Sequence, residues 1–254
     1  MFLIRSAVSL FLVAVAAMAA HPDQASAEAI MVETTNGPVR ATRIAAPGEA
    51  PRPAVLILHA RQAIEPFAAA YGRYADDLSR AGIDAWLISY YSVEDTAAMS
   101  DPDRARRTAT LHARIGAWAK AIDDVAGFVL ARKESSGRLG LLGFSNGAFL
   151  AVAAATDPRI GALVVFYGGV LDVVRDHIVL LPPLLALHGD ADGTVPISAG
   201  RELVEKAHAL GGEAELITYP GAGHGFDFAP HSPIADDARA RAIAFLRSHL
   251  GTAP

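Results

Sequence analysis

The sequence predicts an α/β fold in which helices cover both faces of a mostly parallel central sheet. Continuous apolar runs such as residues 54–59 and 162–167 are typical of strands buried on both faces. Segments with helical start and stop signals separate these runs, and strands that alternate with helices form parallel crossovers. The chain has 254 residues, of which 52% are hydrophobic and 19% charged, so it is long enough for one domain with a sizeable core.

The predicted elements begin with a hairpin. Asn36-Gly37 lies between two β-prone segments at residues 30–33 and 39–44, and this dipeptide favours a tight turn that would add antiparallel strands to the sheet. Further strands are expected at residues 54–59, 83–90, 139–144, 162–167, 183–188 and 214–219. Helices are expected at residues 66–80, 101–133, 146–156, 198–210 and 234–250, and residues 92–100 are expected to form a loop.

The N-terminus has the layout of a secretory signal peptide. One positive charge at Arg5 precedes an apolar run over residues 7–20, and Ala25-Ser26-Ala27 offers a cleavage pattern. The alternative is a membrane anchor, but the run is shorter than the ~20 apolar residues that span a bilayer. We therefore expect a leader at residues 1–27 and a mature domain at 28–254, exported to a bacterial periplasm without stable membrane association.

Composition argues against several classes of function. The net charge is −5, and the scattered basic residues give no nucleic-acid patch. One small cluster, Arg104, Arg106 and Arg107, is expected to be a solvated helix start rather than a phosphate site. The chain has no cysteine, which excludes disulfides, thiolate catalysis and thiolate metal sites. Its nine histidines show no tight ligand spacing, so no metal site is expected. No oligomeric state is predicted.

The central motif is Gly143-Phe144-Ser145-Asn146-Gly147, which follows an apolar strand and precedes an Ala-rich helix. It matches the G-x-S-x-G nucleophile elbow, in which a serine projects from a sharp strand-to-helix turn. Gly143 and Gly147 would provide the space that such a turn needs, because a Cβ at either position would crowd the adjacent backbone. The alternative is a glycine-rich turn with an incidental serine.

An acid and a histidine follow later strands. Asp190 and Asp192 come after the strand at 183–188, and His224 comes after the strand at 214–219. Because the carboxyl ends of parallel strands meet at one edge of the sheet, these side chains are expected near Ser145. The order Ser, Asp, His is that of α/β-hydrolases. We assign Ser145 as nucleophile, His224 as base and Asp192 as the acid that orients it, with Asp190 as the alternative acid.

Two backbone N–H groups are expected to form an oxyanion hole. One belongs to Asn146, the residue after the nucleophile. The other comes from the loop after the first buried strand, where Arg61 is preferred over Ala60 and Gln62. His59 is expected to be a packing residue at the end of that strand.

Three motifs together resemble the dienelactone hydrolase family of α/β-hydrolases, with a match from about Val55 to the C-terminus. They are Gly143-Phe144-Ser145-Asn146-Gly147, His188-Gly189 leading to Asp192 and Val195-Pro196, and Tyr219-Pro220-Gly221-Ala222-Gly223-His224-Gly225-Phe226. The resemblance implies a single α/β-hydrolase domain without a large cap, which acts on small esters or lactones without a cofactor.

The chain departs from that family pattern at three positions. The resemblance implies a cysteine nucleophile, whereas this chain has Ser145. It also implies an acidic residue on the loop after the first buried strand, where Ala60 stands here. It further implies a carboxylate-binding arginine four residues past the histidine, and that position is Phe228. We therefore expect a serine esterase with an apolar pocket rather than a hydrolase of dienelactone itself. Candidates for the pocket lining are Phe226, Phe228, Tyr90, Tyr91 and Tyr167.

The sequence therefore predicts a hydrolase whose partner is a small-molecule ester or lactone. A serine peptidase or acyltransferase on the same fold is the nearest alternative. A binding protein that kept the fold and lost the chemistry is a third reading, which the intact Ser, Asp and His set opposes.

Overall fold

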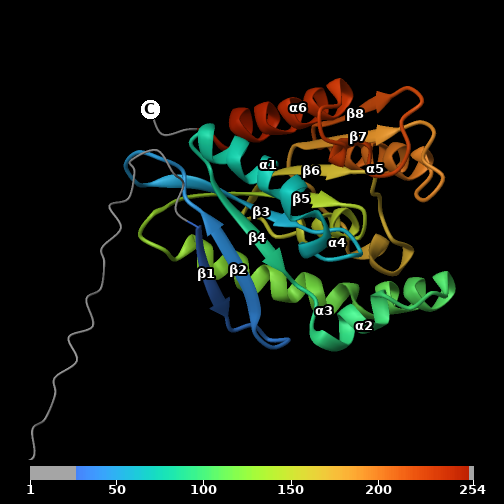
Figure 1. The fold of residues 1–254 in the computed structure, drawn as a ribbon, viewed down its shortest axis with the longest axis horizontal. Helices are drawn as coiled ribbons and strands as arrows, with labels where there is room; N and C mark the ends of the chain where they lie inside the picture. The colour runs from blue at the N-terminus through green and yellow to red at the C-terminus, as the bar shows by residue number, and fades with distance from the viewer. Residues whose placement is uncertain (1–26, 252–254) are drawn as a thin grey trace, which may run out of the picture.

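The computed structural model describes residues 27–251, which form one eight-stranded sheet with helices on both faces (Figure 1). The predicted fold class is therefore confirmed. The predicted leader, apart from Ala27, lies outside the described residues. No helix between residues 27 and 251 has the length and apolar character needed to cross a membrane.

The sheet combines an antiparallel edge with a parallel body. Its strand order is β1-β2-β4-β3-β5-β6-β7-β8. The predicted hairpin is present: β1 pairs antiparallel with β2, β2 pairs antiparallel with β4, and every other pair is parallel. The strands are β1 (Ala27–Val32), β2 (Val39–Ile44), β3 (Arg52–Leu58), β4 (Asp84–Ser89), β5 (Ser135–Phe144), β6 (Ile160–Phe166), β7 (Leu184–Gly189) and β8 (Ala214–Tyr219).

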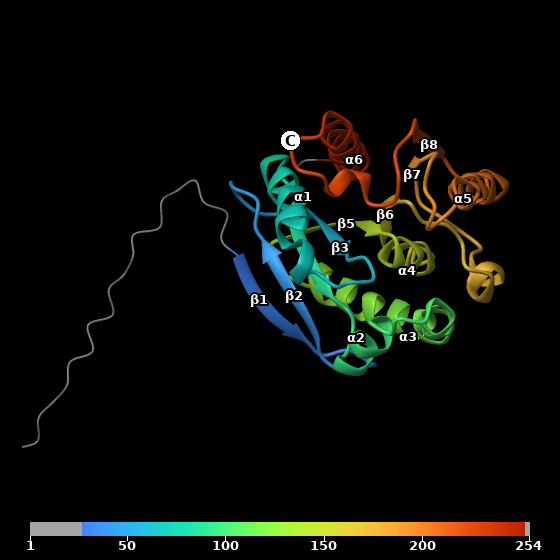
Figure 2. The same ribbon diagram turned by 45° about the vertical axis from the view of Figure 1, so that its right-hand side comes forward.

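The helices form a layer on each side of the sheet. Helices α1 and α6 cover one face, and α3, α4 and α5 cover the other, as two views show (Figures 1 and 2). The α-helices are α1 (Ala68–Arg80), α2 (Val93–Met99), α3 (Arg104–Leu130), α4 (Asn146–Ala154), α5 (Ile197–Ala209) and α6 (Pro233–Leu250). Three short 3₁₀ helices are η1 (Glu65–Phe67), η2 (Asp172–His177) and η3 (Phe226–Phe228).

The loop expected at residues 92–100 is wrong, because α2 occupies this segment. Ser92 Oγ accepts a hydrogen bond from Asp95 N at 3.0 Å, and the Asp95 carboxylate accepts one from Ser92 N at 3.2 Å. This reciprocal capping box satisfies two backbone donors at the start of a helix. Helix α3 likewise begins at Arg104 rather than 101, because the Asp103 carboxylate accepts from Ala105 N at 2.7 Å. Both caps were readable as local sequence signals.

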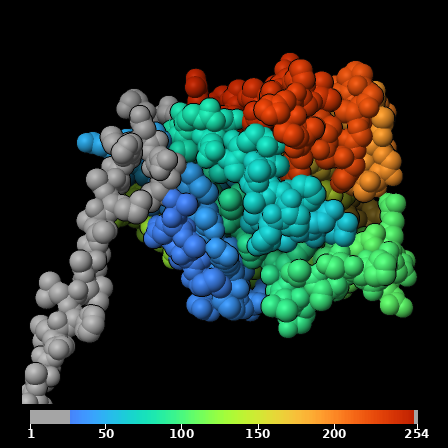
Figure 3. All heavy atoms as spheres, viewed as in Figure 1, coloured from blue at the N-terminus to red at the C-terminus, as the bar shows by residue number. Residues whose placement is uncertain are grey.

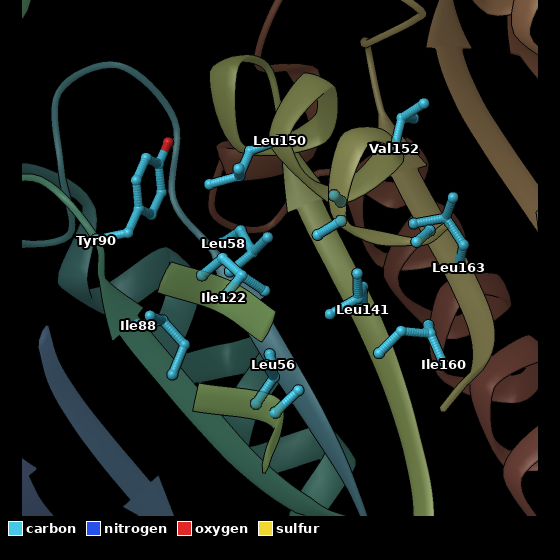
Figure 4. Close-up of a cluster of buried hydrophobic side chains, with 14 of the residues drawn as sticks. Leu56, Leu58, Ile88, Tyr90, Ile122, Leu141, Leu150, Val152, Ile160 and Leu163 are labelled. Atoms are coloured by element: carbon cyan, nitrogen blue, oxygen red, sulfur yellow. The ribbon is translucent and has the colours of Figure 1, made fainter. Parts of the chain in front are cut away.

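The core fills both faces of the sheet, which explains the unbroken apolar runs. Successive strand residues point to opposite faces. On the face covered by α3 and α4, leucines of three central strands meet Ile122 and Leu150 of these helices (Figure 4). Those leucines are Leu56, Leu58, Leu141 and Leu163. On the opposite face Val55, Ile57 and Leu142 pack beneath α1 and α6. A sheet buried on both sides holds its strand ends, and the loops that follow them, in fixed positions.

Candidate active site

The turn between β5 and α4 holds Ser145 in a strained conformation. Its φ is 52° and its ψ is −113°, which residues with a side chain rarely adopt. A hydrogen bond of 3.0 Å from Ser145 N to Phe166 O on β6 fixes the turn. A Cβ on Gly143 would overlap the carbonyl oxygen of Gly147, and one on Gly147 would overlap that of Leu58 on β3. Both predicted elbow glycines are therefore required by close backbone packing.

Three predicted residues form one hydrogen-bonded chain. His224 Nε2 lies 2.9 Å from Ser145 Oγ, and His224 Nδ1 lies 2.7 Å from Asp192 Oδ2. The Asp192 side chain is fully buried, and its other oxygen accepts from the N–H groups of Thr194 and Val195 at 2.8 and 2.9 Å. A carboxylate held in this way orients the imidazole, because Nδ1 must carry the proton and Nε2 is left free to accept one.

The alternative acid, Asp190, has a different partner. Its Oδ1 accepts from Gly221 N at 2.7 Å, so it ties the loop after β7 to the loop after β8. Among residues 27–251 its side chain forms neither a hydrogen bond nor an ion pair with His224. Asp190 therefore shapes the loops, and Asp192 alone reaches the imidazole.

A second histidine, His188 at the end of β7, lies beside Asp192. Its Nε2 is 3.0 Å from Val195 O and 3.6 Å from Asp192 Oδ2. Burial lowers the pKa of His188, which favours the neutral imidazole as a hydrogen-bond donor to Val195. No role was predicted for His188 from the sequence. Its place immediately before Gly189 and the acid loop was the available signal.

The structure of the loop after β3 excludes one of the three candidates for the second oxyanion-hole donor. Ala60 N already donates to the Tyr71 hydroxyl at 2.7 Å, which removes Ala60 from consideration. Within the described residues, the N–H groups of Arg61 and Gln62 donate no hydrogen bond, and both residues line the pocket beside Ser145. Within residues 27–251 Asn146 N, at the start of α4, also donates no hydrogen bond, and the side-chain amide of Asn146 donates to Tyr91 Oη at 3.1 Å.

A pocket of about 550 Å³ opens above Ser145 and His224. The loop after β3 (cyan in Figure 3) lies beside the segment of α2 and α3 (green). A hydrogen bond of 3.1 Å from Arg61 Nη1 to Met99 O connects the two segments. Of the five aromatic residues expected in the lining, Phe228 and Tyr167 contribute, whereas Phe226, Tyr90 and Tyr91 do not. Further apolar residues in the lining include Phe67, Met99, Leu111, Phe149, Leu171 and Val195.

The pocket is not purely apolar, and this corrects the sequence expectation. Arg61, Arg104 and Arg107 line it, and no aspartate or glutamate does. Their guanidinium groups donate to the backbone carbonyls of Met99, Thr194 and Asp101 respectively. Among residues 27–251 none of the three arginines forms an ion pair with a carboxylate. The pocket therefore has an uncompensated positive wall although the whole chain is acidic.

A model of the dienelactone hydrolase family matches residues 39–249, from β2 to α6. The chain belongs to the dienelactone hydrolase family. The resemblance drawn from the three sequence motifs is thus confirmed.

Two bacterial proteins are moderately similar to the chain. A Bradyrhizobium protein provisionally named 2-oxo-3-(5-oxofuran-2-ylidene)propanoate lactonase is 30% identical over 239 residues, covering 85% of this chain and 92% of the relative. An Escherichia coli K12 protein provisionally named carboxymethylenebutenolidase is 28% identical over 147 residues, which is 51% of this chain and 53% of that protein. The match thus spans about half the length of the Escherichia coli relative.

The solved structure of a dienelactone hydrolase from Anabaena variabilis shares the fold. Its TM-score is 0.71 at 19% identity, and the match covers 89% of this chain and 99% of that one. At this identity the likeness concerns the fold and not the substrate.

This member of the dienelactone hydrolase family places its charges differently from the expected pattern. Phe228, four residues past His224, lines the pocket without a charge. The arginines come from the start of α3 and from the loop after β3 instead. Between residues 27 and 251 no group of three or more His, Asp or Glu side chains is arranged to hold a metal ion.

Asp227 is a buried carboxyl that the sequence argument missed. It is 0% exposed, and its Oδ2 accepts from the Tyr74 hydroxyl of α1 at 2.7 Å. Tyr167 lies between this carboxyl and the site: its ring packs on that of His224 at a centroid distance of 4.5 Å. Burial raises the pKa of Asp227 to about 6, although the hydroxyls of Tyr74 and Tyr167 favour the ionised form. A single acid between two phenylalanines, three residues past His224, was the available sequence signal.

The raised pKa predicts how stability depends on pH. Between about pH 4 and 6 the unfolded chain loses a proton from Asp227 that the folded protein still holds, so this group makes the free energy of unfolding fall as pH rises. A shift of about two units corresponds to roughly 3 kcal/mol. The variant Asp227→Asn lacks this contribution. The difference in the free energy of unfolding, variant minus wild type, is therefore expected to increase by about 2–3 kcal/mol as the pH is raised from 4 to 7. Urea denaturation at each pH measures this difference. A difference that does not change with pH would contradict the assignment.

Proposed function

We propose that the chain is an exported serine hydrolase that cleaves small carboxylic esters or lactones through an acyl-enzyme. The observation that carries this proposal is the hydrogen-bonded chain from Ser145 through His224 to Asp192 at the base of an open pocket. Membership of the dienelactone hydrolase family supports the same reaction class.

Acylation begins at Ser145. His224 Nε2 accepts the hydroxyl proton while Oγ attacks the carbonyl carbon of the substrate, and the carbonyl electron pair moves onto oxygen. The N–H groups of Arg61 and Asn146 stabilise the resulting oxyanion. When the tetrahedral intermediate collapses, the bond to the leaving alkoxide breaks, and the alkoxide receives its proton from His224. The buried Asp192 carboxylate stabilises the imidazolium during both steps.

Deacylation repeats these steps with water. His224 takes a proton from the water molecule as its oxygen attacks the acyl carbon, and the oxyanion forms again at the same two N–H groups. Collapse breaks the bond to Ser145 Oγ, which regains its proton from His224. With a lactone the alcohol and acid products are one molecule, and the balance of bonds and protons is otherwise the same.

We further propose that the preferred substrate carries a negative charge. Arg61, Arg104 and Arg107 give the pocket a positive wall with no carboxylate in the lining. Guanidinium groups bind carboxylates through charge-assisted hydrogen bonds. The related Bradyrhizobium protein is named for a propanoate lactone, which is consistent with such a substrate.

A pair of aryl esters that differ only in a terminal carboxylate or carboxamide tests both parts of the proposal. Wild type is expected to hydrolyse both and to prefer the carboxylate in kcat/KM. Arg107→Gln and Arg104→Gln are each expected to lower kcat/KM for the charged ester about tenfold or more, because a hydrogen bond to a charged group contributes about 1.5–3 kcal/mol. The neutral ester should change less than about threefold.

Arg106→Gln is the matched control, since Arg106 lies on the same helix but pairs with Asp101 and Asp103 and does not line the pocket. An equal loss in this variant, or an equal loss with both esters, would contradict the charge preference. No hydrolysis of any ester would contradict the hydrolase proposal, and faster cleavage of matched amides would favour a peptidase. Export is tested by the N-terminus of the protein recovered from the periplasm, which is expected to be Glu28.

A further inference from the structure

His59 is a buried histidine that the proposed reaction does not use. It directly follows β3 and is 1% exposed. Its Nδ1 lies 2.7 Å from Ala60 O, while its Nε2 is buried and has no hydrogen-bond partner within the described residues. A carbonyl oxygen only accepts, so Nδ1 carries the proton and donates it to Ala60 O. The other tautomer would bury an unsatisfied Nε2 donor.

This hydrogen bond sets the direction of a neighbouring N–H group. Ala60 C=O and Arg61 N–H belong to one planar trans peptide, in which they point in opposite directions. Ala60 O is held on the inside by His59 Nδ1 and also accepts from Ala63 N at 3.1 Å. Ala60 N is held by the Tyr71 hydroxyl at 2.7 Å. The Arg61 N–H must therefore point away from the core, on the side where Ala60 and Arg61 line the pocket.

The imidazole itself is fixed by aromatic neighbours. It stacks on Tyr90 at a centroid distance of 4.0 Å with 10° between the planes, and Tyr91 meets it edge-on at 4.8 Å. The Tyr90 hydroxyl donates to His59 O at 2.8 Å. Tyr91 in turn accepts from the side chain of Asn146, the residue that supplies the other proposed oxyanion donor. One aromatic layer thus supports both sides of the proposed oxyanion hole.

The protonation state of His59 suits a fixed donor. Burial lowers the pKa of His59 to about 4, so the ring stays neutral across the physiological range. The hydrogen bond to Ala60 O and the charge of Glu65 in η1 both favour the protonated form, but the effect of burial on the pKa is larger. A neutral Nδ1–H is therefore available at every pH at which the site would work.

We propose that His59 is a positioning residue for the oxyanion hole, whose Nδ1–H holds the Ala60–Arg61 peptide so that the Arg61 N–H faces the reacting oxygen. This inference rests on the proposed serine hydrolase function. It does not make His59 a catalytic residue, since the side chain is buried behind the loop and touches no substrate.

Two substitutions of His59 test the inference, because one keeps only the N–H donor and the other keeps only the aromatic ring. His59→Asn keeps an N–H donor at the same number of bonds from the backbone, and His59→Phe keeps a ring that can stack on Tyr90 but has no donor. His59→Phe is expected to lower kcat about 10–100-fold with KM changed less than about threefold, because groups that orient catalytic groups have effects of this size. His59→Asn is expected to recover most of that loss.

A transition-state analogue gives a readout that loss of packing alone would not produce. An aryl trifluoromethyl ketone adds to the serine and places an oxyanion in the hole, so its affinity should fall by about the same factor as kcat/KM in His59→Phe and recover in His59→Asn. Melting temperatures and circular dichroism establish that the compared variants are folded. If His59→Phe does not fold, Tyr71→Phe removes only the hydroxyl that holds Ala60 N, and a kcat loss of about threefold to tenfold is expected.

Unchanged kcat in His59→Phe, or equal impairment of folded His59→Asn and His59→Phe, would overturn the inference. A fall in ketone affinity that does not follow kcat/KM would also do so. These results are distinguishable from failure of the proposed function, because that failure would appear as undiminished turnover in Ser145→Ala.

Discussion

Replacing Ser145 with alanine is expected to lower kcat for ester hydrolysis by about 10⁵–10⁶-fold, because the attacking oxygen is removed. The loss should concern turnover and not folding. Ser145 Oγ makes one hydrogen bond, to His224, whereas the turn is held by backbone contacts such as Ser145 N to Phe166 O. Alanine and serine are similarly disfavoured at a φ of 52°, so the melting temperature is expected to stay close to that of wild type.

A fluorophosphonate probe makes this experiment specific to the residue. It should add one covalent adduct to wild type, located at Ser145 by peptide mapping, and none to Ser145→Ala. The acid provides a matched pair of controls. Asp192→Asn is expected to lower kcat about 10⁴-fold, whereas Asp190→Asn, whose carboxylate binds Gly221 N, should retain activity within about tenfold. Undiminished turnover in folded Ser145→Ala would disprove the serine mechanism.

Replacing Gly147 with alanine is expected to have the largest effect on stability. The added Cβ would overlap the carbonyl oxygens of Leu58 and His59, which belong to β3 and its end and cannot rotate away as a side chain would. Relief would require α4 to move from the sheet. The free energy of unfolding should therefore fall by at least about 3 kcal/mol, the upper range for steric overpacking of a core. Urea denaturation measures this loss, and the residual folded protein should have low activity because Ser145 moves with the turn.

Gly72 in α1 is the matched control. Apart from the backbone of α1 itself and the adjacent residues, no atom lies within 4 Å of a Cβ added there, so Gly72→Ala should raise the free energy of unfolding by about 0.5–1 kcal/mol through helix propensity. If Gly147→Ala were as stable as Gly72→Ala, the close approach of α4 to the end of β3 would be wrong.

Local signals accounted for most of the fold. The continuous apolar runs and the Asn36-Gly37 turn predicted the parallel body and the antiparallel hairpin, because backbone pairing and turn geometry depend on neighbours in the sequence. The α2 segment was missed although Ser92 and Asp95 form a capping box, since a seven-residue helix has too short an apolar pattern to stand out.

The sequence by itself determined the order of the candidate catalytic residues along the chain. A serine, an acid and a histidine each follow a strand, and the carboxyl ends of these strands must lie at one edge of the sheet. Only the tertiary structure decided which acid reaches His224, that the Ala60 N–H is already bonded to Tyr71, and which arginines line the pocket. The reason is physical. Strand and turn preferences act over a few residues, whereas hydrogen bonds of about 3 Å between loops depend on how the whole sheet twists and packs. The proposed role of His59 and the raised pKa of Asp227 belong to this second kind, because both pKa shifts arise mainly from burial, which depends on segments far apart in the sequence.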